Sequence, residues 1–434
     1  MLDKEFKEKI EALLGTDRSS FAPEDLIAYS YDANTEKRAM PEGVVLPESV
    51  AEVSAILKLA NEYEVPVTPR GGASGYTGGV VPVEGGIIMA MDRFNKILEI
   101  DRDNFLAIVE PGVITKTLQE EVDKIGLMYP PDPASTAFST IGGNIAENSG
   151  GLRAVKYGVT KNYVMGLEVV LPTGEVVRTG SKCIKDVVGY NLTELFVGSE
   201  GTLGVITKAT FKLFEQPESR QHRAFLFPDM HSGYMAGRDI MQKVKPSILR
   251  FFDEAETVSI IKKILGFEKK GCFMNVTLEG MKKIVDIELE IVEEIAAKWG
   301  AQDLGGEYGE KWYENRITFF YPGNIMDIPQ MFGTMDTVAT YANIEKIYLA
   351  MKKVINEKFP YVKYISHSSH WYEWGCMNYT RFIVDPAHVP SDPDEAIRLH
   401  NQIWNAGVRA AMENGGVIND HHGIGLKLSR LMKE

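Results

Sequence analysis

The 434-residue sequence predicts an α+β fold built from two or three domains. A chain of this length exceeds one average domain. Its first half contains short apolar runs separated by glycine-rich turns, which is typical of short strands joined by loops. After about residue 215 the pattern changes, and strand-like segments alternate with long amphipathic helical segments. This change predicts that a second α+β domain follows the first.

Composition excludes several classes of protein. Hydrophobic residues make up 44% of the chain and charged residues 25%, as in soluble globular proteins. A net charge of −13 argues against a nucleic-acid or anionic-membrane surface. No apolar run approaches the roughly 20 residues that span a bilayer, and the charged, amphipathic N-terminus does not resemble a signal peptide.

The three cysteines are far apart and form no CxxC pair. This spacing fits a reducing cytoplasm, and it argues against an iron–sulfur or zinc site made of cysteines within this chain. We therefore expect a cytoplasmic protein.

The first half reads as a strand–helix–strand unit that ends in a glycine loop. In a Rossmann fingerprint the glycines open the helix, whereas here they follow the second strand. The expected elements are a strand at residues 44–46, a helix at 51–64, strands at 65–68, 86–91 and 107–109, and a helix at 115–125.

Residues 129–207 form the stretch around which the first half is organised. Its glycines are interrupted by short apolar runs and by the small polar side chains of Thr140, Asn144 and Asn148. Glycine lets backbone lie flat against a ligand and turn its N–H groups toward phosphate. Glycine and asparagine also mark ordinary tight turns. The pattern alone leaves a large anionic cofactor and a turn-rich β domain equally open.

The second half is predicted to contain long helices and a paired strand segment. The expected strands lie at residues 224–227, 271–278 and 318–320, with two more within 364–384. The expected helices lie at residues 282–299, 343–357 and 394–413, followed by a loop at 415–425.

A series of collinear motifs carries a family resemblance. They are PRGGASGYTGG, PPDPAS, TIGGN, NSGG, KYGVT, KDVVGYNLTELFVGSEGTLGVIT and HHGIG. The chain resembles the vanillyl-alcohol-oxidase/p-cresol-methylhydroxylase (PCMH) class of FAD enzymes, and within it the glycolate oxidase D-subunit and D-lactate dehydrogenase branch. The resemblance implies an FAD-binding PCMH-type domain at residues 1–215, an α+β cap or substrate domain at 216–390, and a C-terminal helix and HHGIG loop at 391–434 that returns to the flavin.

The resemblance also implies which residues hold the cofactor. The glycine loop would wrap the pyrophosphate, two later segments would line the flavin, and residues 200–206 would bind the far end of FAD. The residues so assigned are Arg70, Gly71, Gly72, Ala73, Ser74, Gly75, Tyr76, Pro131, Asp132, Ser135, Thr140, Gly142, Gly143, Asn144, Asn148, Gly150, Gly151, Glu200, Gly201, Gly204 and Ile206. All eight histidines lie at or after His222, so histidyl attachment from the first domain is excluded and FAD is expected to be non-covalent.

The second half contains the residue types that oxidation of a 2-hydroxy acid requires. Histidine suits removal of the hydroxyl proton because its pKa is near neutrality. An arginine fork can bond both oxygens of a carboxylate. The candidate catalytic residues are Arg250, His370, Tyr379, Arg381, His421 and His422.

Two motifs depart from the lactate and glycolate pattern. Relatives of that branch carry a GDGN-type stretch and then GEHGIG around a divalent metal, whereas this chain reads SHWYEWGCMNY and NDHHGIG, with His421 at the glutamate position. The spacing from His370 to Tyr379 instead resembles alkylglycerone-phosphate synthase, which implies Tyr379 as acid/base. That branch carries an arginine where this chain reads FYPGN at residues 320–324.

The leading hypothesis is an FAD-dependent oxidoreductase. It would oxidise a small 2-hydroxy acid of the D-lactate or glycolate type by hydride transfer to flavin N5, and pass electrons to a protein or quinone. One alternative is a synthase-like FAD transferase, and another is an electron-transfer flavoprotein subunit of a larger complex. No metal is assigned, although His367, His370, His421 and His422 offer an alternative imidazole site.

Expected partners are an electron-accepting subunit, either an iron–sulfur protein or an electron-transfer flavoprotein, and further copies of the chain. Relatives continue a few dozen residues beyond HHGIG, so we expect that the remaining part is either lost or supplied by another chain.

Overall fold

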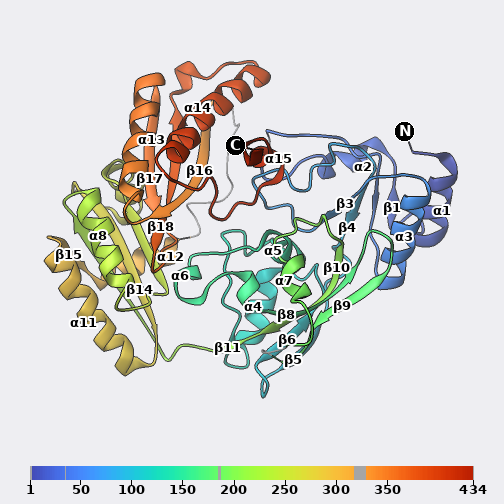
Figure 1. The fold of residues 1–434 in the computed structure, drawn as a ribbon, viewed down its shortest axis with the longest axis horizontal. Helices are drawn as coiled ribbons and strands as arrows, with labels where there is room; N and C mark the ends of the chain where they lie inside the picture. Colours follow the sequence, from blue (N-terminus) through green and yellow to red (C-terminus); the bar gives the residue numbers. More distant parts are fainter. Residues whose placement is uncertain (1, 35, 184–186, 317–328, 434) are drawn as a thin grey trace. The chain divides into compact units, whose positions relative to one another are not determined.

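The computed structural model describes residues 2–34, 36–183, 187–316 and 329–433. The chain forms two compact units (Figure 1). Unit 1 comprises Met1–Gly150, Val159–Gln216 and His422–Glu434, and unit 2 comprises Gly151–Gly158 and Pro217–His421. The strand expected at residues 318–320 and the FYPGN segment lie outside the described residues.

Unit 1 contains a four-stranded sheet in the order β1-β2-β4-β3. Strands β2, β4 and β3 are parallel, and β1 is antiparallel to β2. Helix α3 connects two of the parallel strands; Ser49 caps it by accepting a hydrogen bond from the Glu52 N–H. The bounds are β1 Ser19–Ser20, β2 Gly43–Val45, α3 Val50–Glu62, β3 Val67–Arg70 and β4 Ile87–Ala90.

A second, five-stranded antiparallel sheet completes the strand framework of unit 1, in the order β5-β6-β10-β8-β9. A short pair, β7 and β11, lies outside it. The bounds are β5 Ile97–Asp101, β6 Leu106–Val109, β7 Leu127–Met128, β8 Val164–Val170, β9 Val176–Gly180, β10 Val205–Lys212 and β11 Phe214–Glu215.

The helices of unit 1 are mostly short. Helix α1 packs its apolar face into one core with α3 and the parallel strands. Besides α3, the helices of this unit are α1 Lys4–Leu14, α2 Pro23–Leu26, η1 Ile27–Tyr29, α4 Thr115–Asp123, α5 Ile141–Glu147, η2 Thr160–Asn162, α7 Leu192–Phe196, α15 Gly425–Leu428 and η5 Ser429–Lys433. Helix α5 was not expected, because its glycines are poor helix formers.

Unit 2 is organised around a seven-stranded antiparallel sheet in the order β15-β12-β14-β13-β17-β18-β16. The bounds are β12 Ser219–Phe227, β13 Ile248–Phe252, β14 Cys272–Gly280, β15 Gln302–Gly305, β16 Met331–Thr340, β17 Val362–Ser368 and β18 Gly375–Val384. The sequence indicated β12, β14 and the β17–β18 pair, but not β13, β15 or β16.

Helices α8, α11 and α13 cover one face of this sheet, and α14 packs against α13 and β16 (Figure 1). Helix α12 contributes Trp312 to a core with β12, β13 and β14. The helices are α6 Ala154–Tyr157, α8 Met230–Met241, α9 Glu254–Glu256, the π-helical turn η3 Thr257–Ile261, α10 Lys262–Leu265, α11 Lys282–Lys298, α12 Gly306–Asn315, α13 Ile344–Lys358, η4 Pro386–His388 and α14 Pro393–Glu413.

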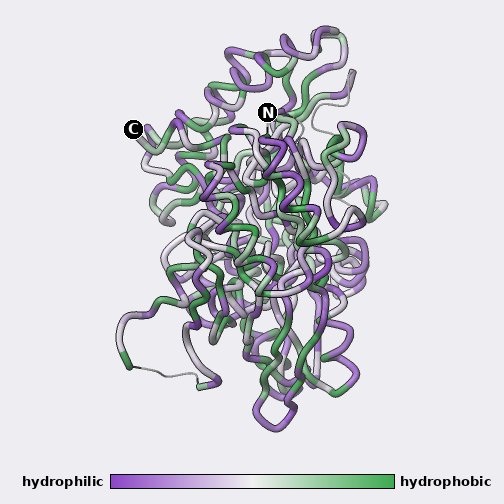
Figure 2. The backbone as a smooth tube through the Cα atoms, turned by 90° about the vertical axis from the view of Figure 1, so that its right-hand side faces the viewer, coloured by the Kyte–Doolittle hydropathy of each residue, from purple (hydrophilic) through white to green (hydrophobic). Residues whose placement is uncertain are grey.

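Hydropathy follows this packing. In Figure 2 hydrophilic and hydrophobic residues alternate along the helical turns, which is the pattern of helices with one buried face. Among the described helices, none combines the length and the apolarity needed to cross a bilayer.

Candidate functional site

The glycine loop after β3 packs directly on a second predicted cofactor segment of unit 1. A Cβ atom at Gly71 would lie 2.3 Å from Thr140 Oγ1, and one at Gly72 would lie 2.2 Å from the Phe138 carbonyl oxygen. Only glycine permits this approach. A Cβ at Gly75 would meet no atom within 4 Å, so the loop presents this stretch of backbone to open space.

Polar contacts hold the loop in shape. The Asp32 carboxylate accepts a hydrogen bond from the Gly78 N–H at 2.8 Å, and the Asn34 amide donates to the Tyr76 carbonyl at 2.7 Å. Ala73 adopts a left-handed backbone conformation, with φ of 49°. The Arg70 guanidinium donates to the backbone carbonyls of residues 28 and 31. The Arg70 side chain therefore braces the N-terminal segment.

The second segment begins helix α5. Thr140 Oγ1 accepts a hydrogen bond from the Gly143 N–H at 3.3 Å, and the Asn144 amide donates to Thr115 Oγ1 at 2.7 Å. A Cβ at Gly142 would lie 2.6 Å from Pro111. The glycines of TIGGN thus allow close packing within unit 1.

A pocket of about 520 Å³ lies beside these two segments. It is lined by Gly72, Asp92, Asn95, Gly112, Val113, Ile114, Thr117, Phe138 and Thr140. Glycine backbone beside a pocket, with Gly75 facing open space, fits a cofactor whose phosphates are held by N–H groups. Gly72 and Thr140, both assigned to FAD, line this pocket.

The other assigned cofactor residues are distributed over unit 1, with one exception. The Pro131 carbonyl accepts a hydrogen bond from Gln119, Asn148 caps α5 in a left-handed conformation, and Gly204 packs on β8. Ile206 belongs to β10. Asp132, Ser135, Gly150 and Gly201 lie in loops of unit 1, as do Ser74 and Tyr76, whereas Gly151 belongs to unit 2.

Glu200 holds the C-terminal segment of unit 1. Its carboxylate accepts hydrogen bonds from the N–H groups of Ile424 (2.7 Å) and Gly425 (2.9 Å). Glu200 itself has φ of 51°, a conformation that costs a non-glycine residue energy. The His422 ring lies 5.8 Å from the Tyr76 ring, so His422 is placed beside the glycine loop. The assignment of Glu200 to FAD stays a prediction.

Glu147 lies beside the same segment. A Cβ at Gly423 would lie 2.4 Å from Glu147 Oε2, and this oxygen has no hydrogen-bond partner among the described residues. Burial, reinforced by the charges of Glu200 and Asp32, raises the pKa of Glu147 to about 8. Glu147 is therefore largely protonated at neutral pH.

In unit 2, strand register aligns three polar side chains. His367 on β17 pairs with Tyr379 on β18, and Tyr379 pairs with Asp336 on β16. Directly paired residues project from the same face of a sheet. The His367 and Tyr379 rings are stacked, with centroids 4.9 Å apart.

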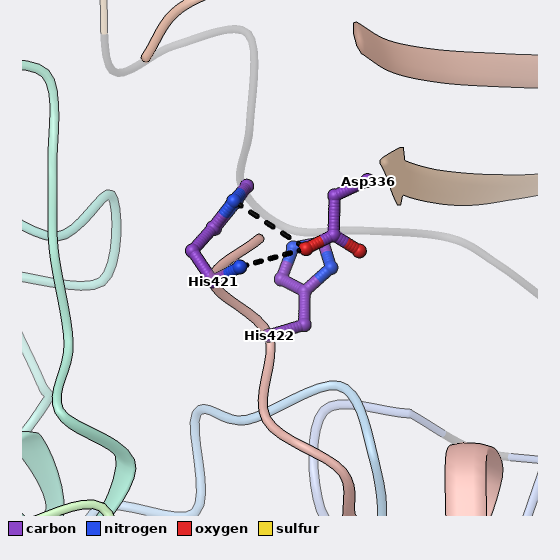
Figure 3. Close-up of side chains that lie close together, drawn as sticks. All are labelled: Asp336, His421 and His422. Atoms are coloured by element: carbon purple, nitrogen blue, oxygen red, sulfur yellow. Dashed lines mark hydrogen bonds and ion pairs between the residues drawn. The ribbon is translucent and has the colours of Figure 1, made fainter. Parts of the chain in front are cut away.

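The loop after α14 adds His421 and Asp420 to this row. The His421 N–H donates to Asp336 Oδ2 at 2.9 Å (Figure 3). The Asp420 N–H donates to the same oxygen at 3.1 Å. The His421 ring stacks on Tyr379 with centroids 5.7 Å apart, and lies edge-on to His370 at 4.9 Å. The structure thus brings together three of the candidate catalytic residues, His370, Tyr379 and His421.

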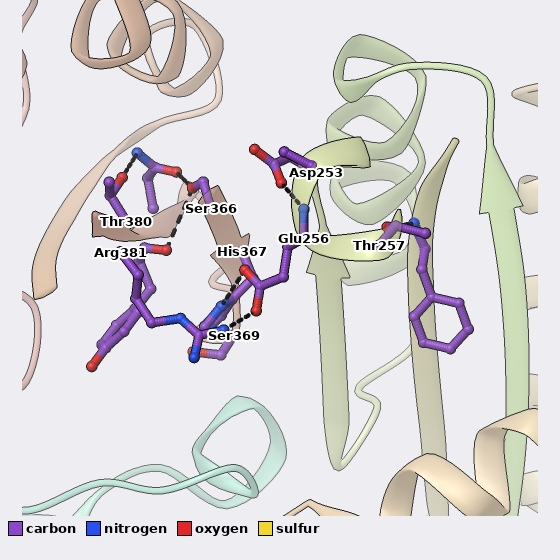
Figure 4. A network of polar contacts seen from close by, with 12 residues as sticks. Asp253, Glu256, Thr257, Ser366, His367, Ser369, Thr380 and Arg381 are labelled. Carbon is purple, nitrogen blue, oxygen red and sulfur yellow. Dashed lines mark hydrogen bonds and ion pairs between the residues drawn. The ribbon is translucent and has the colours of Figure 1, made fainter. Parts of the chain in front are cut away.

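A second polar cluster lies in the same sheet (Figure 4). Glu256 follows β13 and is bound by Arg381 and by His367 Nδ1, the latter at 3.2 Å. Burial opposes ionisation of Glu256, but Arg381 and His367 outweigh it and lower its pKa to about 2. Burial lowers the pKa of His367 to about 4; the charge of Glu256 opposes this shift, and the charge of Arg250 adds to it. Hence Glu256 is charged and His367 neutral at pH 7.

A metal-ligand geometry is also present in unit 2. Each of the residues His370, Asp420 and His421 offers one possible ligand atom, and these three atoms lie within 4.8 Å of one another. His367 is not part of this group, because its Nδ1 lies on Glu256. Of the four histidines suggested by the sequence, His370 and His421 belong to this group, and Asp420 completes it. Sequence reasoning gave no role to Asp336, Asp420 or Glu256, since strand pairing and loop docking bring them to the site.

Both halves of the chain match known protein families. The "FAD binding domain" family matches residues 41–180, and "FAD linked oxidases, C-terminal domain" matches residues 216–434. The chain belongs to the FAD-linked oxidase family, and its cofactor is FAD.

Three similar proteins illustrate the relationship. The glycolate oxidase subunit GlcD of Bacillus subtilis is 42% identical over 69% of this chain and 65% of its own length. A D-lactate dehydrogenase of Anaerostipes hadrus is 38% identical over 62% of this chain and 58% of its own. The match therefore spans less than two thirds of these relatives. A solved alkyldihydroxyacetonephosphate synthase is 26% identical with a TM-score of 0.84, over 96% of this chain and 81% of its own.

Solved structures also bear out the expected fold class. The structure of p-cresol methylhydroxylase superposes with a TM-score of 0.79 at 18% identity, over 98% of this chain and 90% of its own. The α+β fold with a PCMH-type FAD-binding domain is thus confirmed.

Proposed function

We propose that the protein oxidises a small 2-hydroxy acid to the 2-oxo acid. The observation that carries the proposal is the spacing of Tyr379 and Arg381 on β18. Residues two apart on a strand share a face and lie about 7 Å apart along it. A compact substrate whose carboxylate and hydroxyl sit on neighbouring carbons fits between a guanidinium and the Tyr379–His421 pair.

The charges around Glu256 favour a monocarboxylate as substrate. We call the residues that carry them, Arg250, Glu256, His367 and Arg381 with the neighbouring Asp253, the Glu256 cluster. Arg250 precedes Phe252 by two residues on β13, and Phe252 pairs with His367, so Arg250 shares the face of that histidine. Glu256 offsets one of the two guanidinium charges of Arg250 and Arg381, and His367 is neutral. Asp253 is a further carboxyl beside Glu256, and burial together with the Glu256 charge raises its pKa to about 7, so it carries about half a negative charge at neutral pH. At most one net positive charge remains, which matches a carboxylate better than a phosphate dianion.

Bound FAD would supply the hydride acceptor for oxidation of the substrate carbon. The Arg381 guanidinium binds the carboxylate, and an imidazole nitrogen of His421 takes the hydroxyl proton. Tyr379 stacks on His421 and orients the hydroxyl. Electrons then leave through a partner subunit or a quinone; the similarity to a protein named as a subunit of glycolate oxidase supports a partner.

The second candidate is a synthase-like transferase. The similarity to the alkyldihydroxyacetonephosphate synthase structure favours it, together with the spacing from His370 to Tyr379. Such an enzyme would need to bind a phosphate ester, so the charge of the Glu256 cluster distinguishes the two candidates.

Anaerobic substrate addition tests the proposal. D-lactate, L-lactate, glycolate and larger 2-hydroxy acids are added to the FAD-loaded protein while the visible flavin bands are followed. Bleaching by one of them supports the oxidation. Bands that persist with every acid, together with ether formation from an acyl dihydroxyacetone phosphate and a long-chain alcohol, would replace it with the transferase.

A further inference from the structure

Asp420 is a buried carboxylate for which the sequence indicated no role. Its Oδ2 atom lies 2.5 Å from His370 Nδ1 and 3.1 Å from His421 Nδ1. Its Oδ1 atom accepts a hydrogen bond from the Tyr372 hydroxyl at 2.9 Å. Only 3% of the Asp420 side chain is exposed. One carboxylate therefore contacts two of the candidate catalytic rings.

The loop that carries Asp420 is fixed to the sheet at two points. The Asp420 and His421 N–H groups both donate to Asp336 on β16. Three residues earlier, Val417 forms an antiparallel bridge with Val338 on the same strand. The carboxylate is thus held in place by backbone contacts that do not involve its own side chain.

The contacts of Asp420 determine where the histidine protons lie. Three groups that can donate, the two imidazole Nδ1 atoms and the Tyr372 hydroxyl, converge on the Asp420 carboxylate. An ionised carboxylate accepts hydrogen bonds only, so each neutral imidazole must carry its proton on Nδ1. The other nitrogen, Nε2, is then the proton acceptor of each ring.

We propose that Asp420 is a positioning residue that fixes His370 and His421 in the Nδ1–H tautomer, so that His421 Nε2 can take the substrate hydroxyl proton. The inference rests on the proposed function for the proton step. In that step the substrate O–H bond breaks, an N–H bond forms on Nε2, and the imidazolium is paired with Asp420. Carboxylate orientation of a catalytic histidine is known to act in this way in hydrolases with a Ser-His-Asp arrangement.

The substitution Asp420→Asn separates this role from a structural one. Both Nδ1 atoms contact the same carboxylate oxygen, so an asparagine that keeps its carbonyl there still accepts both protons but lacks the negative charge that pairs with the imidazolium. An asparagine that turns its amide there forces both rings into the opposite tautomer. We expect the anaerobic rate constant for flavin reduction by the active 2-hydroxy acid to fall about 100-fold or more. FAD content should be unchanged, and Asp420→Glu should recover part of the rate.

Nitrogen-15 NMR of histidine side chains in the FAD-loaded protein identifies which ring nitrogen carries the proton, and this measurement does not depend on activity. The wild type should show Nδ1–H signals for His370 and His421, and Asp420→Ala, which removes their shared acceptor, should move at least one of them to Nε2–H. The matched control Tyr372→Phe removes a contact to Asp420 but leaves both imidazole contacts, so both tautomers should persist. This spectrum tests Asp420 even when no acid reduces the flavin, an outcome that would contradict the proposed function alone.

Three results would overturn the inference. The first is a wild-type spectrum in which either ring carries its proton on Nε2. The second is a wild-type reduction rate in Asp420→Asn. The third is stoichiometric zinc or iron in the purified protein that is lost with Asp420→Asn, since the three residues would then act as metal ligands.

Discussion

The two units bury carboxylates with opposite consequences. In unit 1, Glu147 lies near Glu200 and Asp32, and its pKa rises to about 8. In unit 2, Glu256 is more deeply buried, yet its pKa falls to about 2 because Arg381 and His367 bind it. Burial opposes ionisation in both places, so the nearby cations decide the outcome. Burial thus keeps the Glu147 carboxyl of unit 1 largely uncharged at neutral pH, whereas the Glu256 carboxylate of unit 2 stays ionised in its contact with Arg381.

The largest expected effect comes from removing the proposed base of unit 2. His421→Ala should slow flavin reduction by about 100- to 10,000-fold, the usual contribution of a positioned general base. FAD content should remain that of the wild type, because the assigned FAD residues other than Gly151 belong to unit 1. Stopped-flow absorbance gives the rate, and the ratio of visible to ultraviolet absorbance gives the FAD content. A wild-type rate would remove His421 from the mechanism.

Breaking the ion pairs of Glu256 should strongly destabilise unit 2. Glu256→Gln leaves Arg381 with a neutral partner, and loss of one member of a buried pair costs about 3–5 kcal/mol. The carboxyl pKa falls from 4.5 to about 2 on folding, so Glu256 stabilises the folded state above pH 4.5 and this contribution is lost as pH falls toward 2. Urea unfolding at pH 7 and pH 3 measures the change. Equal stability of variant and wild type at pH 7 would contradict this account of the cluster.

The matched substitution in unit 1, Glu147→Gln, should change the free energy of unfolding in the opposite direction, by stabilising the protein. The pKa of Glu147 rises from 4.5 to about 8 on folding, so the unfolded chain ionises first and the free energy of unfolding falls as pH rises between these values. Glu147→Gln should remove this slope and stabilise the protein at pH 8, by a few kcal/mol at most. Thermal unfolding from pH 5 to 8 gives the comparison. A variant less stable than wild type at pH 8 would show that Glu147 is ionised and paired.

The smallest effect is expected at Gly75. An added Cβ there meets no atom within 4 Å, so Gly75→Ala should leave the stability of the FAD-free protein unchanged. A methyl group in a space that the cofactor fills should weaken FAD binding by about 1–3 kcal/mol. Gly72→Ala is the contrasting variant, because its Cβ would collide with the Phe138 carbonyl and should destabilise the FAD-free protein as well. FAD titration and thermal unfolding separate the two, and unchanged FAD affinity in Gly75→Ala would place the cofactor elsewhere.

The sequence predicted regular elements well where periodicity was strong. The helices expected at residues 282–299, 343–357 and 394–413 correspond to α11, α13 and α14 within a residue or two. Strand β16 was missed, because Met331–Thr340 mixes small and polar residues without regular alternation. Helix α5 was missed because Gly142 and Gly143 lower helix propensity, which close packing on Pro111 offsets.

The candidate site was predictable only in part. His370, Tyr379 and His421 could be proposed from their residue types and motifs. Asp336 and Asp420 could not, because they reach His421 through the pairing of β16 with β18 and the docking of a loop on β16. Sequence spacing does not encode such non-local register. The same limit applies to the comparison of the two units. The glycine loops could be predicted from the sequence because their residues are consecutive, whereas the partners of the buried carboxylates could not, because they come from distant parts of the chain.

The proposed oxidation of a 2-hydroxy acid is tested most directly by flavin reduction with an isotopically labelled substrate. The FAD-loaded protein is mixed anaerobically with a reducing 2-hydroxy acid carrying either hydrogen or deuterium on the hydroxyl-bearing carbon. If that carbon donates the hydride, the flavin bands will bleach more slowly with the deuterated acid. Flavin that stays oxidised with every acid, or bleaches at one rate with both labels when binding is saturated, would contradict the account.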